Sequence, residues 1–363
     1  MKLLLINAVC GIRSTGRICI QIAQEYKSKG YEVKIAYGRE RVPSEYTEYA
    51  VKIGNNRDVY FHALMDRLFG KRGEYSRRAT KKFLKWADEF NPDVLWLHNI
   101  HDYFINIEML FDWIKSRPDM QVKWTQHDCW AFTGGCFHFP CSCEQWKTHC
   151  TNCEGRTSRC DVGVSYEKKK RMFTGIKNME IIVVSHWLEG LVKQSFLCDY
   201  PITVIHNKID TTVFKPGNKD YFERNSITDK KVVLGVASAW SEKKGLGDFI
   251  KLAELLPKDY RIVLVGLTEK QIKGMPTSIH CIKKTNSKNQ LAEIYNSSFV
   301  FVNPTYQDSY PTVNLEAQAC GLPVITYNTG GSPETLGEDK GYVIEQGNVN
   351  ALAEKIMELG SEN

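Results

Sequence analysis

Short apolar runs of strand length alternate with amphipathic stretches of helical length along almost the whole chain. The run LLLIN (3–7) precedes a glycine turn and then RICIQIAQEYKSKG, which is amphipathic and ends at Gly30, and a second helical stretch lies near 77–90. The other apolar runs of this first part are EVKIAYG (32–38), DVLWLHN (93–99), QVKWTQHD (121–128), IIVVS (181–185) and ITVIHN (202–207). Because strands that alternate with helices form doubly wound parallel sheets, we predict an α/β fold.

The same alternation begins again after Phe214-Lys215-Pro216. Its strand-like runs are KVVLGVAS (231–238), YRIVLVG (260–266), SIHCIKK (278–284), SFVFVNP (298–304) and LPVITYN (322–328), with helical patterns at 246–256 and 289–297. The segment 207–230 is polar and lacks periodicity, so we interpret it as a hinge. The length of 363 residues favours two domains. We predict two Rossmann-like domains, 1–207 and 208–363, that face each other across a cleft.

Composition narrows the class of protein only a little. Apolar residues make up 42% and charged residues 25%, as in ordinary globular proteins, and the net charge is +6. That charge permits anionic ligands or an anionic membrane surface, but no basic stripe indicates nucleic acid. The initial run LLLI is shorter than the apolar core of a signal peptide, about 7–15 residues, so we expect a cytoplasmic protein. Its cysteines should then be thiols or metal ligands.

Ligands of open parallel sheets bind at the carboxyl ends of the strands, so the loops that follow strands hold the candidate sites. The first candidate is Gly11-Ile12-Arg13-Ser14-Thr15-Gly16, which follows the first strand and opens a helix. Its glycines allow a tight turn, and the helix N-terminus offers unpaired N–H groups to an anion. It lacks the dinucleotide-binding pattern G-x-G-x-x-G, and an ordinary strand–helix turn stays an equal alternative.

The second candidate is the segment from Gln307 to Ala317, which follows the run FVFVNP. Pro311 suits the first turn of a helix, whose N–H groups at Thr312, Val313 and Asn314 would point at an anion. Asp308 and Glu316 are eight residues apart and can flank a single ligand. The alternative is that Asp308 caps the helix and Glu316 is a solvated surface residue.

The third candidate is the segment from Trp240 to Gly245. Lys244 precedes a glycine at a helix start, where an ammonium group could neutralise a diphosphate. A solvated run of charges is the alternative for Lys243 and Lys244.

Taken together, these motifs resemble those of the family 4 retaining glycosyltransferases of the GT-B type, in the branch that makes bacterial capsule and exopolysaccharide. The resemblance covers nearly the whole chain. Its most specific part runs from Asp308 to Glu316, the family's pair of acidic residues, and continues through Ala317 to Ile325. Its other parts are Thr329 to Glu334, Lys244-Gly245, Asn207 with Asp210 and Phe214, and Ser14 to Arg17.

Some positions depart from the family pattern. The first residue of the acidic pair is usually Glu in the family, and here it is Asp308. The family has an Arg six residues before the glycine of the Lys-Gly motif, and here that position is Ala239. The family has a glycine in the hinge motif where this chain has Lys208. Neutralisation of a diphosphate would then depend more on Lys244, aided by Lys243. The family usually has a further C-terminal helix that crosses back to the first domain, beyond the helix expected near 350–359.

The resemblance implies a sugar donor, a UDP- or GDP-sugar, bound by the second domain without a required cofactor. Glu316 would take the ribose hydroxyls, Asp308 the sugar hydroxyls, and Lys244 with Ser238 and the N–H groups of Tyr310 to Val313 the diphosphate. Residues from Ile282 to Lys284 would meet the base. The implied donor-binding residues are Gly16, Ser238, Lys244, Ile282, Lys283, Ser309, Tyr310, Pro311, Thr312, Val313 and Glu316, and the implied catalytic residues are His127, Asp308 and Lys244.

The resemblance places a saccharide or lipid-linked saccharide acceptor on the first domain, with peripheral membrane association as a further expectation. His127-Asp128 matches the family's H-D position, where a histidine can hydrogen-bond the donor sugar or orient the acceptor hydroxyl. The other residues expected on this side are Ser14, Thr15, His98 and His101. A structural role is the alternative for each histidine, and we consider it the better one for His98.

Six of the twelve cysteines lie between Cys129 and Cys153. We interpret 129–160 as a Cys-rich insertion in which Cys136, Cys143, Cys150 and Cys153 hold a structural zinc or pack as free thiols, with disulfides as a third alternative. The extra side chains of this stretch are Cys141, Cys160, His138 and His149. Four thiolates would close the coordination sphere, which argues against catalytic zinc. The aromatic residues Trp130, Phe132, Phe137 and Phe139 form either an apolar lip for a lipid-linked acceptor or part of the core.

Two other functions stay open at this point. One is a nucleotide-sugar epimerase with the same fold, which would interconvert free sugar nucleotides without an acceptor. The other is a non-catalytic protein that binds a sugar nucleotide without turnover.

Overall fold

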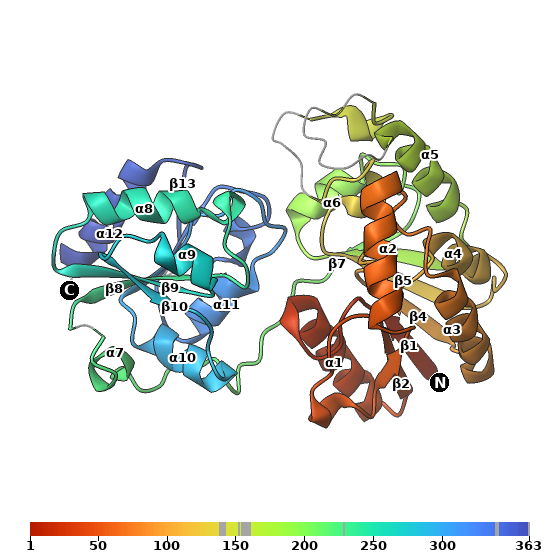
Figure 1. Ribbon diagram of the computed structural model, residues 1–363, viewed down its shortest axis with the longest axis horizontal. Helices are drawn as coiled ribbons and strands as arrows, with labels where there is room; N and C mark the ends of the chain where they lie inside the picture. The colour runs from red at the N-terminus through yellow and green to blue at the C-terminus, as the bar shows by residue number, and fades with distance from the viewer. Residues whose placement is uncertain (138–142, 152, 154–160, 228, 338–340, 362–363) are drawn as a thin grey trace. The chain divides into compact units, whose positions relative to one another are not determined.

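The chain divides into two compact units, Met1–His206 and Asn207–Asn363, each built on one parallel sheet (Figure 1). The computed structural model describes residues 1–137, 143–151, 153, 161–227, 229–337 and 341–361. Residues of the segment 207–230, which the sequence analysis assigned to a hinge, belong to the second unit. Phe214, Tyr221 and Phe222 are buried in its core.

The sheet of the first unit has seven parallel strands in the order β3-β2-β1-β4-β5-β6-β7. They are β1 (Lys2–Ile6), β2 (Glu32–Tyr37), β3 (Ala50–Lys52), β4 (Val94–Leu97), β5 (Gln121–Gln126), β6 (Met179–Val183) and β7 (Ile202–Val204). β1, β4 and β6 are buried almost throughout, as expected for strands that helices cover on both faces. The short strand β3 was not predicted, because its three residues give too short an alternation to recognise.

The helices of the first unit are α1 (Arg13–Ser28), α2 (Asn56–Phe69), α3 (Arg77–Phe90), α4 (Ile107–Lys115), α5 (Val162–Phe173) and α6 (His186–Val192), with 3₁₀ turns η1 (Ser44–Tyr46), η2 (Trp130–Phe132) and η3 (Gln145–Lys147). The sequence analysis predicted α1 and α3 and did not identify α2. Local signals nevertheless define α2 sharply. Asn55 and Asp58 form a capping box at its start, and Gly70 ends it in the left-handed conformation, with φ of 65°.

The sheet of the second unit has six parallel strands in the order β10-β9-β8-β11-β12-β13. They are β8 (Lys231–Val236), β9 (Tyr260–Val265), β10 (Ile279–Ile282), β11 (Val300–Asn303), β12 (Val324–Tyr327) and β13 (Gly341–Ile344), of which β13 was not predicted. The helices are α7 (Tyr221–Arg224), α8 (Leu246–Leu255), α9 (Glu269–Lys273), α10 (Lys288–Asn296), α11 (Thr312–Ala319) and α12 (Val349–Ser361), with 3₁₀ turns η4 (Glu242–Lys244) and η5 (Pro333–Thr335).

Both sheets place their first strand in an inner position from which the chain proceeds in opposite directions. In the first unit β1 lies between β2 and β4, and in the second β8 lies between β9 and β11. The crossover helices on the two sides of such a point diverge and leave room for a ligand beyond the carboxyl ends of the strands. The loops after β1 and β4, and after β8 and β11, are therefore where the topology allows a site.

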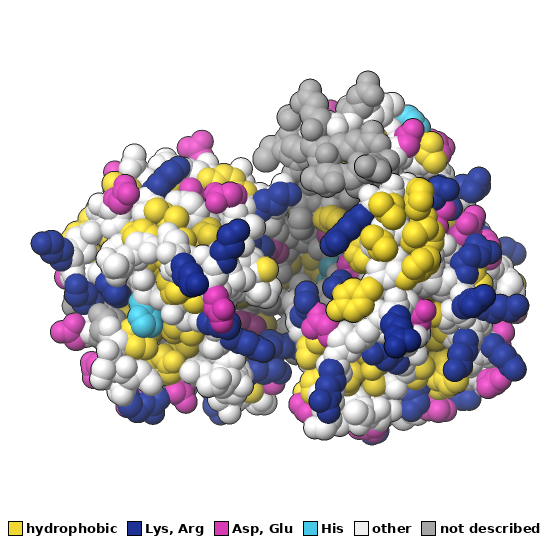
Figure 2. All heavy atoms as spheres, viewed as in Figure 1, with side chains coloured by type: hydrophobic (Ala, Val, Ile, Leu, Met, Phe, Trp, Pro, Cys, Tyr) yellow, Lys and Arg dark blue, Asp and Glu magenta, His cyan; other side chains and the backbone are white. Residues whose placement is uncertain are grey.

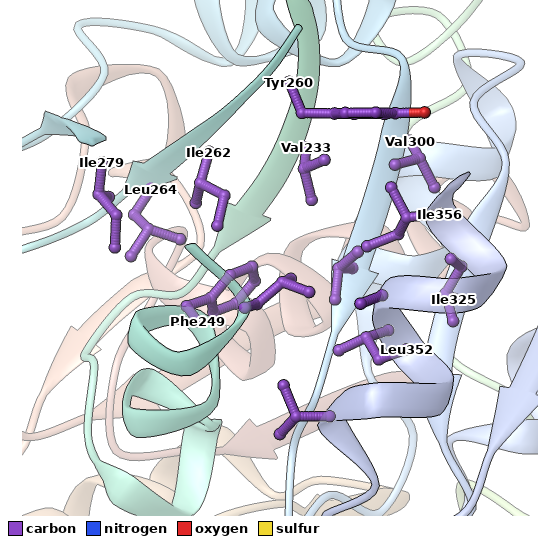
Figure 3. Close-up of a cluster of buried hydrophobic side chains, with 14 of the residues drawn as sticks. Val233, Phe249, Tyr260, Ile262, Leu264, Ile279, Val300, Ile325, Leu352 and Ile356 are labelled. Carbon is purple, nitrogen blue, oxygen red and sulfur yellow. The ribbon is translucent and has the colours of Figure 1, made fainter. Parts of the chain in front are cut away.

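The second sheet is covered on both faces by separate hydrophobic clusters. One cluster packs Val233, Ile262 and Leu264 under Phe249 of α8 and Leu352 of α12 (Figure 3). The other cluster, on the opposite face, contains the alternate strand residues Val232, Leu234, Val263 and Val265. Strands β8, β9, β11 and β12 therefore present apolar side chains to both faces, which is why they were visible in the sequence as nearly continuous apolar runs.

We predict that Phe249→Ala lowers the free energy of unfolding of the second unit by about 3–5 kcal/mol, because it removes a fully buried ring from this cluster. Leu255→Ala on the same helix is the matched control, since that side chain is 44% exposed, and it should cost less than about 1 kcal/mol. Chemical denaturation followed by circular dichroism measures the free energy of unfolding of both variants. Equal decreases in the two variants would contradict the assignment of Phe249 to the core.

Candidate functional site

The centre of the candidate site is an ion pair between two side chains from neighbouring strand ends. Lys244 closes the η4 turn after β8, and Asp308 lies in the loop between β11 and α11. The Lys244 Nζ lies 2.6 Å from Asp308 Oδ2 and 3.5 Å from the carbonyl oxygen of Gln307. The two side chains are 35% and 23% exposed, so a ligand from solvent can reach both. The sequence analysis gave them separate roles, and the structure joins them.

Two glycines allow the loops around this pair to approach one another. A Cβ on Gly245, whose φ is +73°, would lie 2.2 Å from the Pro304 carbonyl oxygen, and one on Gly330, whose φ is +55°, would lie 2.0 Å from the Asp308 carbonyl oxygen. That same Asp308 oxygen accepts a hydrogen bond from the Gly331 N–H at 3.2 Å. The glycines of the KG and TGG motifs are therefore required by backbone contacts that fix Lys244 and Asp308.

Helix α11 begins beside the pair, and within the described residues no side-chain hydrogen bond caps its start. Pro311 occupies the N-cap position, where no side-chain hydrogen bond forms, while Asp308 Oδ1 accepts from the Tyr310 N–H at 3.2 Å. The interpretation of Asp308 as the helix cap is therefore wrong. Within the described chain, the Ser309 hydroxyl is buried and has no hydrogen-bond partner. These features leave N–H and O–H donors for an anion at this helix end.

Glu316 lies further along α11 and is buried, so the alternative of a solvated surface residue is wrong. Its Oε2 accepts a hydrogen bond from the Tyr295 hydroxyl at 3.3 Å. Burial and then the nearby Glu316 carboxylate hold the pKa of Tyr295 well above its usual range. Burial and the same carboxylate raise the pKa of Cys320 to about 11.

Three other predicted donor residues lie at or just after the carboxyl ends of β8 and β10. Ser238 is exposed in the loop after β8, and Ile282 is partly buried at the end of β10. Lys283 Nζ pairs with Glu269 Oε1 at 2.5 Å on the exposed surface. Because β10 is separated from β8 by β9, a ligand that met both ends would have to extend across two strand spacings.

In the first unit, the glycine loop after β1 is closed on itself. The Gly11 N–H donates to the Gly16 carbonyl at 3.1 Å, and Ser14, Thr15 and Gly16 lie within the first turn of α1. The Asn7 side chain donates to Thr15 Oγ1 at 3.3 Å. The predicted roles of Ser14, Thr15 and Gly16 toward ligands stay predictions.

Two histidines predicted at the acceptor side lie against each other at the ends of β4 and β5. His98 Nδ1 and His127 Nε2 are 3.0 Å apart, so one ring must donate and the other accept. Burial, with His127 as a second cause, holds the pKa of His98 well below its usual range. Burial lowers the pKa of His127 to about 4, although Asp128 opposes the shift. Both rings are therefore neutral at pH 7.

His101 is the charged member of the same group. Its Nε2 lies 3.1 Å from Asp128 Oδ2, and its Nδ1 makes an ion-pair contact of 3.4 Å with Asp102 Oδ1. Burial alone would lower the pKa of His101, but the two carboxylates outweigh it and raise the value to about 9. Arg39 pairs with Asp102 at 3.3 Å. The sequence analysis missed Arg39 and Asp102, although His101-Asp102 repeats the dipeptide His127-Asp128 after the neighbouring strand.

The described part of the Cys-rich stretch packs into the first unit. Trp130 and Phe132 are buried, so they form part of the core and not an apolar lip. Phe137 is half-buried against the ring of His101. His138, Phe139, Cys141 and Cys160 lie outside the described residues.

Cys136, Cys143, Cys150 and Cys153 form no disulfide within the described residues. Burial, followed by Cys153, Cys150 and Cys143, raises the pKa of Cys136 to about 11, which shows that these sulfurs lie near one another. Among the described residues, however, no three His, Cys, Asp or Glu side chains form a set that could hold a metal ion. The structural zinc at these cysteines stays a prediction.

Comparison with known proteins gives the family. The family described as Glycosyltransferase Family 4 matches residues 15–213, and the one described as Glycosyl transferases group 1 matches residues 217–363. The chain belongs to glycosyltransferase family 4. The family resemblance noted in the sequence is thereby confirmed, and so is the prediction that the chain is a glycosyltransferase enzyme.

This glycosyltransferase is similar to the colanic acid biosynthesis glycosyl transferase WcaC of Escherichia coli K12, with 21% identity over 79% of this chain and 71% of that protein. It is also similar to the capsular polysaccharide biosynthesis glycosyltransferase CapM of Staphylococcus aureus, with 26% identity over 50% of this chain and 52% of that protein. The chain thus spans only about half the length of CapM.

Among solved structures, the glycosyltransferase resembles Anabaena Alr3699/HepE in complex with UDP, with a TM-score of 0.67, 15% identity and coverage of 100% of this chain and 90% of that one. It also resembles the sucrose-phosphate synthase of Thermosynechococcus elongatus, with a TM-score of 0.72, 15% identity and coverage of 99% and 90%. These similarities confirm the predicted fold of two parallel-sheet domains of the GT-B type.

The histidine group generates a prediction about protonation. His101 should titrate near pH 9 in the folded protein, above the ordinary value of about 6.5, and His127 should titrate near pH 4. The stability that His101 contributes should be fully present below about pH 6.5 and lost as the pH rises through about 9. Asp128→Asn should lower the pKa of His101 by removing one of its two carboxylates. NMR titration of the imidazole resonances measures these values, and a His101 that titrates at 6.5 would contradict the arrangement.

Proposed function

We propose that the second unit binds a nucleotide-diphosphate sugar at the Lys244–Asp308 pair, and that the enzyme transfers the sugar, with retention, to a saccharide acceptor in polysaccharide biosynthesis. The observation that carries the proposal is the accessible Lys244–Asp308 contact beside the start of α11. The printed names of WcaC and CapM support the pathway, and the HepE complexes with UDP and UDP-glucose support the class of donor.

In this proposal Lys244 binds the diphosphate of the donor and thereby releases Asp308. Its ammonium is paired with one carboxylate, and a diphosphate brings a greater negative charge to the same place. When phosphate oxygens take the Lys244 Nζ, the Asp308 carboxylate is released and can accept hydrogen bonds from the sugar hydroxyls. Donor binding thus exchanges one ion pair for two ligand contacts.

The diphosphate must also be stabilised as it leaves, because negative charge grows on it when the bond to the sugar breaks. Ala239 stands where the family pattern has an Arg, so the chain offers one fewer cation than that pattern at this position. Lys244, the N–H groups of Thr312 and Val313 and the Ser309 hydroxyl supply positive potential in fixed positions. Such preorganised donors lower the barrier without having to reorient during the reaction.

Glu316 is proposed to accept hydrogen bonds from the ribose hydroxyls. It is already buried and holds the Tyr295 hydroxyl on one oxygen, so its position is fixed before the nucleotide arrives. Because a carboxylate has two oxygens and about four acceptor positions, a ribose diol can bind without breaking that contact.

The acceptor is proposed to bind the first unit near His127. The neutral His127 ring can accept a proton or a hydrogen bond from a sugar hydroxyl at neutral pH, which a protonated ring could not do. The adjacent His101 is charged and fixed between two carboxylates, so it orients Asp128 and adds no free base. A lipid carrier on the acceptor is part of this proposal.

Donor affinities measured by isothermal titration calorimetry test the proposal. UDP, GDP, ADP and dTDP with their sugar derivatives are compared first, and at least one pair should bind. Lys244→Met should lower the affinity for both the nucleotide and its sugar form by about 10- to 100-fold, since it removes a charge-assisted hydrogen bond to phosphate. Asp308→Asn should remove the extra affinity for the sugar form without lowering the affinity for the nucleotide that carries no sugar.

Two further variants complete this design. Glu316→Gln should lower the affinity for every nucleotide that carries a ribose. The substitution removes negative charge from the side chain that is proposed to accept hydrogen bonds from the ribose hydroxyls. Lys251→Met, which removes an exposed lysine of α8, is the matched control and should bind like the unaltered protein. Absence of binding by all four nucleotide classes, or equal effects of Lys244→Met and Lys251→Met, would contradict the donor site.

A further inference from the structure

Helix α2 presents an apolar face to solvent. One row along the helix contains Tyr60, Leu64 and Leu68, and the adjacent row contains Phe61 and Phe69. Each of these five side chains is 45–75% exposed. They are half of the ten large hydrophobic side chains that are exposed in the described part of the chain. Figure 2 shows a patch of hydrophobic side chains, in yellow, over α2. An exposed patch of this kind on one helix indicates a binding surface.

The inner face of α2 is polar, and this explains why the apolar face points outward. His62 and Asp66 are buried beneath the helix. His62 Nδ1 lies 2.9 Å from Ser76 Oγ, and the Gly73 N–H donates to His62 Nε2 at 3.2 Å. Asp66 accepts from the Arg72 guanidinium at 3.2 Å. Rotation of α2 to bury its apolar rows would break these buried hydrogen bonds, so the exposed face is fixed by the fold.

Positive charge is concentrated in the part of the sequence that contains the apolar face. Residues 55–85 contain nine Lys and Arg against three Asp and Glu, a net charge of +6, which equals that of the whole chain. All three acids are engaged: Asp58 in the cap of α2, Asp66 with Arg72, and Glu74 with Lys168. The exposed cations are Arg57, Arg67, Lys71, Arg77, Arg78, Lys81, Lys82 and Lys85, and no ion pair is formed by any of them within the described residues.

We propose that α2 docks this enzyme on the surface of an anionic lipid bilayer. The helix lies in the plane of the interface, with its apolar rows among the upper acyl chains and the surrounding cations at the headgroups. No helix in the described part of the chain is long and apolar enough to cross a bilayer, and α2 has 14 residues, so it lies on the surface.

The charge pattern favours a lipid surface over a second copy of the chain. Two copies that paired symmetrically through α2 would bring the same cations face to face, and like charges oppose such contact. A bilayer with anionic headgroups neutralises all of them at once, at about 1 kcal/mol for each Lys or Arg near the surface. The docking is independent of the proposed donor site, and it would bring the first unit to the place where a lipid-linked acceptor resides.

Co-sedimentation of the full chain with vesicles tests the proposal. Phosphatidylcholine vesicles are compared with vesicles that contain about one third phosphatidylglycerol. We expect the protein to sediment with the anionic vesicles and to be released by high salt. Phe61→Ser with Phe69→Ser should lower the partition coefficient at least tenfold, and Arg57→Gln with Arg67→Gln should weaken the preference for anionic vesicles.

Matched controls change equally exposed side chains elsewhere. Leu255→Ser with Val343→Ser, and Lys251→Gln with Lys258→Gln, should leave sedimentation unchanged. Thermal melting and nucleotide affinity of the α2 variants should match the unaltered protein, which separates lost docking from lost folding and from failure of the donor site. Absence of sedimentation with anionic vesicles, equal losses in the controls, or a dimer in solution that the Phe61 and Phe69 substitutions dissociate would overturn the proposal.

Discussion

The parallel pairing of every strand in both sheets is the constraint on which the rest of the structure depends. Parallel strands require a crossover after each strand, so all carboxyl ends lie at one edge, and the loops that follow them meet there. In the second unit this edge brings the loop after β8 against the loop after β11. Gly245 and Gly330 allow their loops to lie still closer to the backbone of Pro304 and Asp308, because a side chain at either position would collide with that backbone. The geometry of the candidate site follows from these close contacts.

The Lys244–Asp308 pair is suited to exchange partners. A partly exposed ion pair contributes only about 0–1 kcal/mol, whereas hydrogen bonds to charged groups contribute about 1.5–3 kcal/mol. A diphosphate can therefore displace Asp308 from Lys244 at small cost. The pair also keeps both side chains in place before a ligand arrives, since Asp308 is held in addition by the Tyr310 N–H. In the first unit, the buried His101 is held in a similar way by Asp102 and Asp128.

The sequence predicted those features that one local pattern determines. Strands such as β8 and β9 are visible because both of their faces are buried, and the motif residues Asp308 to Glu316 identify the family. The ion pair could not be predicted, because Lys244 and Asp308 are 64 residues apart and only the sheet order brings them together. From the sequence alone, Trp130 and Phe132 could lie either on the surface or in the core, because their neighbours in the fold were not known. Helix α2 was missed because it exposes its apolar face and buries His62 and Asp66, against the usual pattern.

A crystal structure of the second unit's donor site with bound UDP, determined on the full chain, tests the central claim most directly. The account predicts that the Lys244 Nζ leaves Asp308 Oδ2, now 2.6 Å away, and lies about 2.7–3.2 Å from a diphosphate oxygen beside the start of α11. The Asp308 carboxylate would then face the space that the sugar occupies. UDP bound elsewhere, with the Lys244–Asp308 contact intact, would contradict the account.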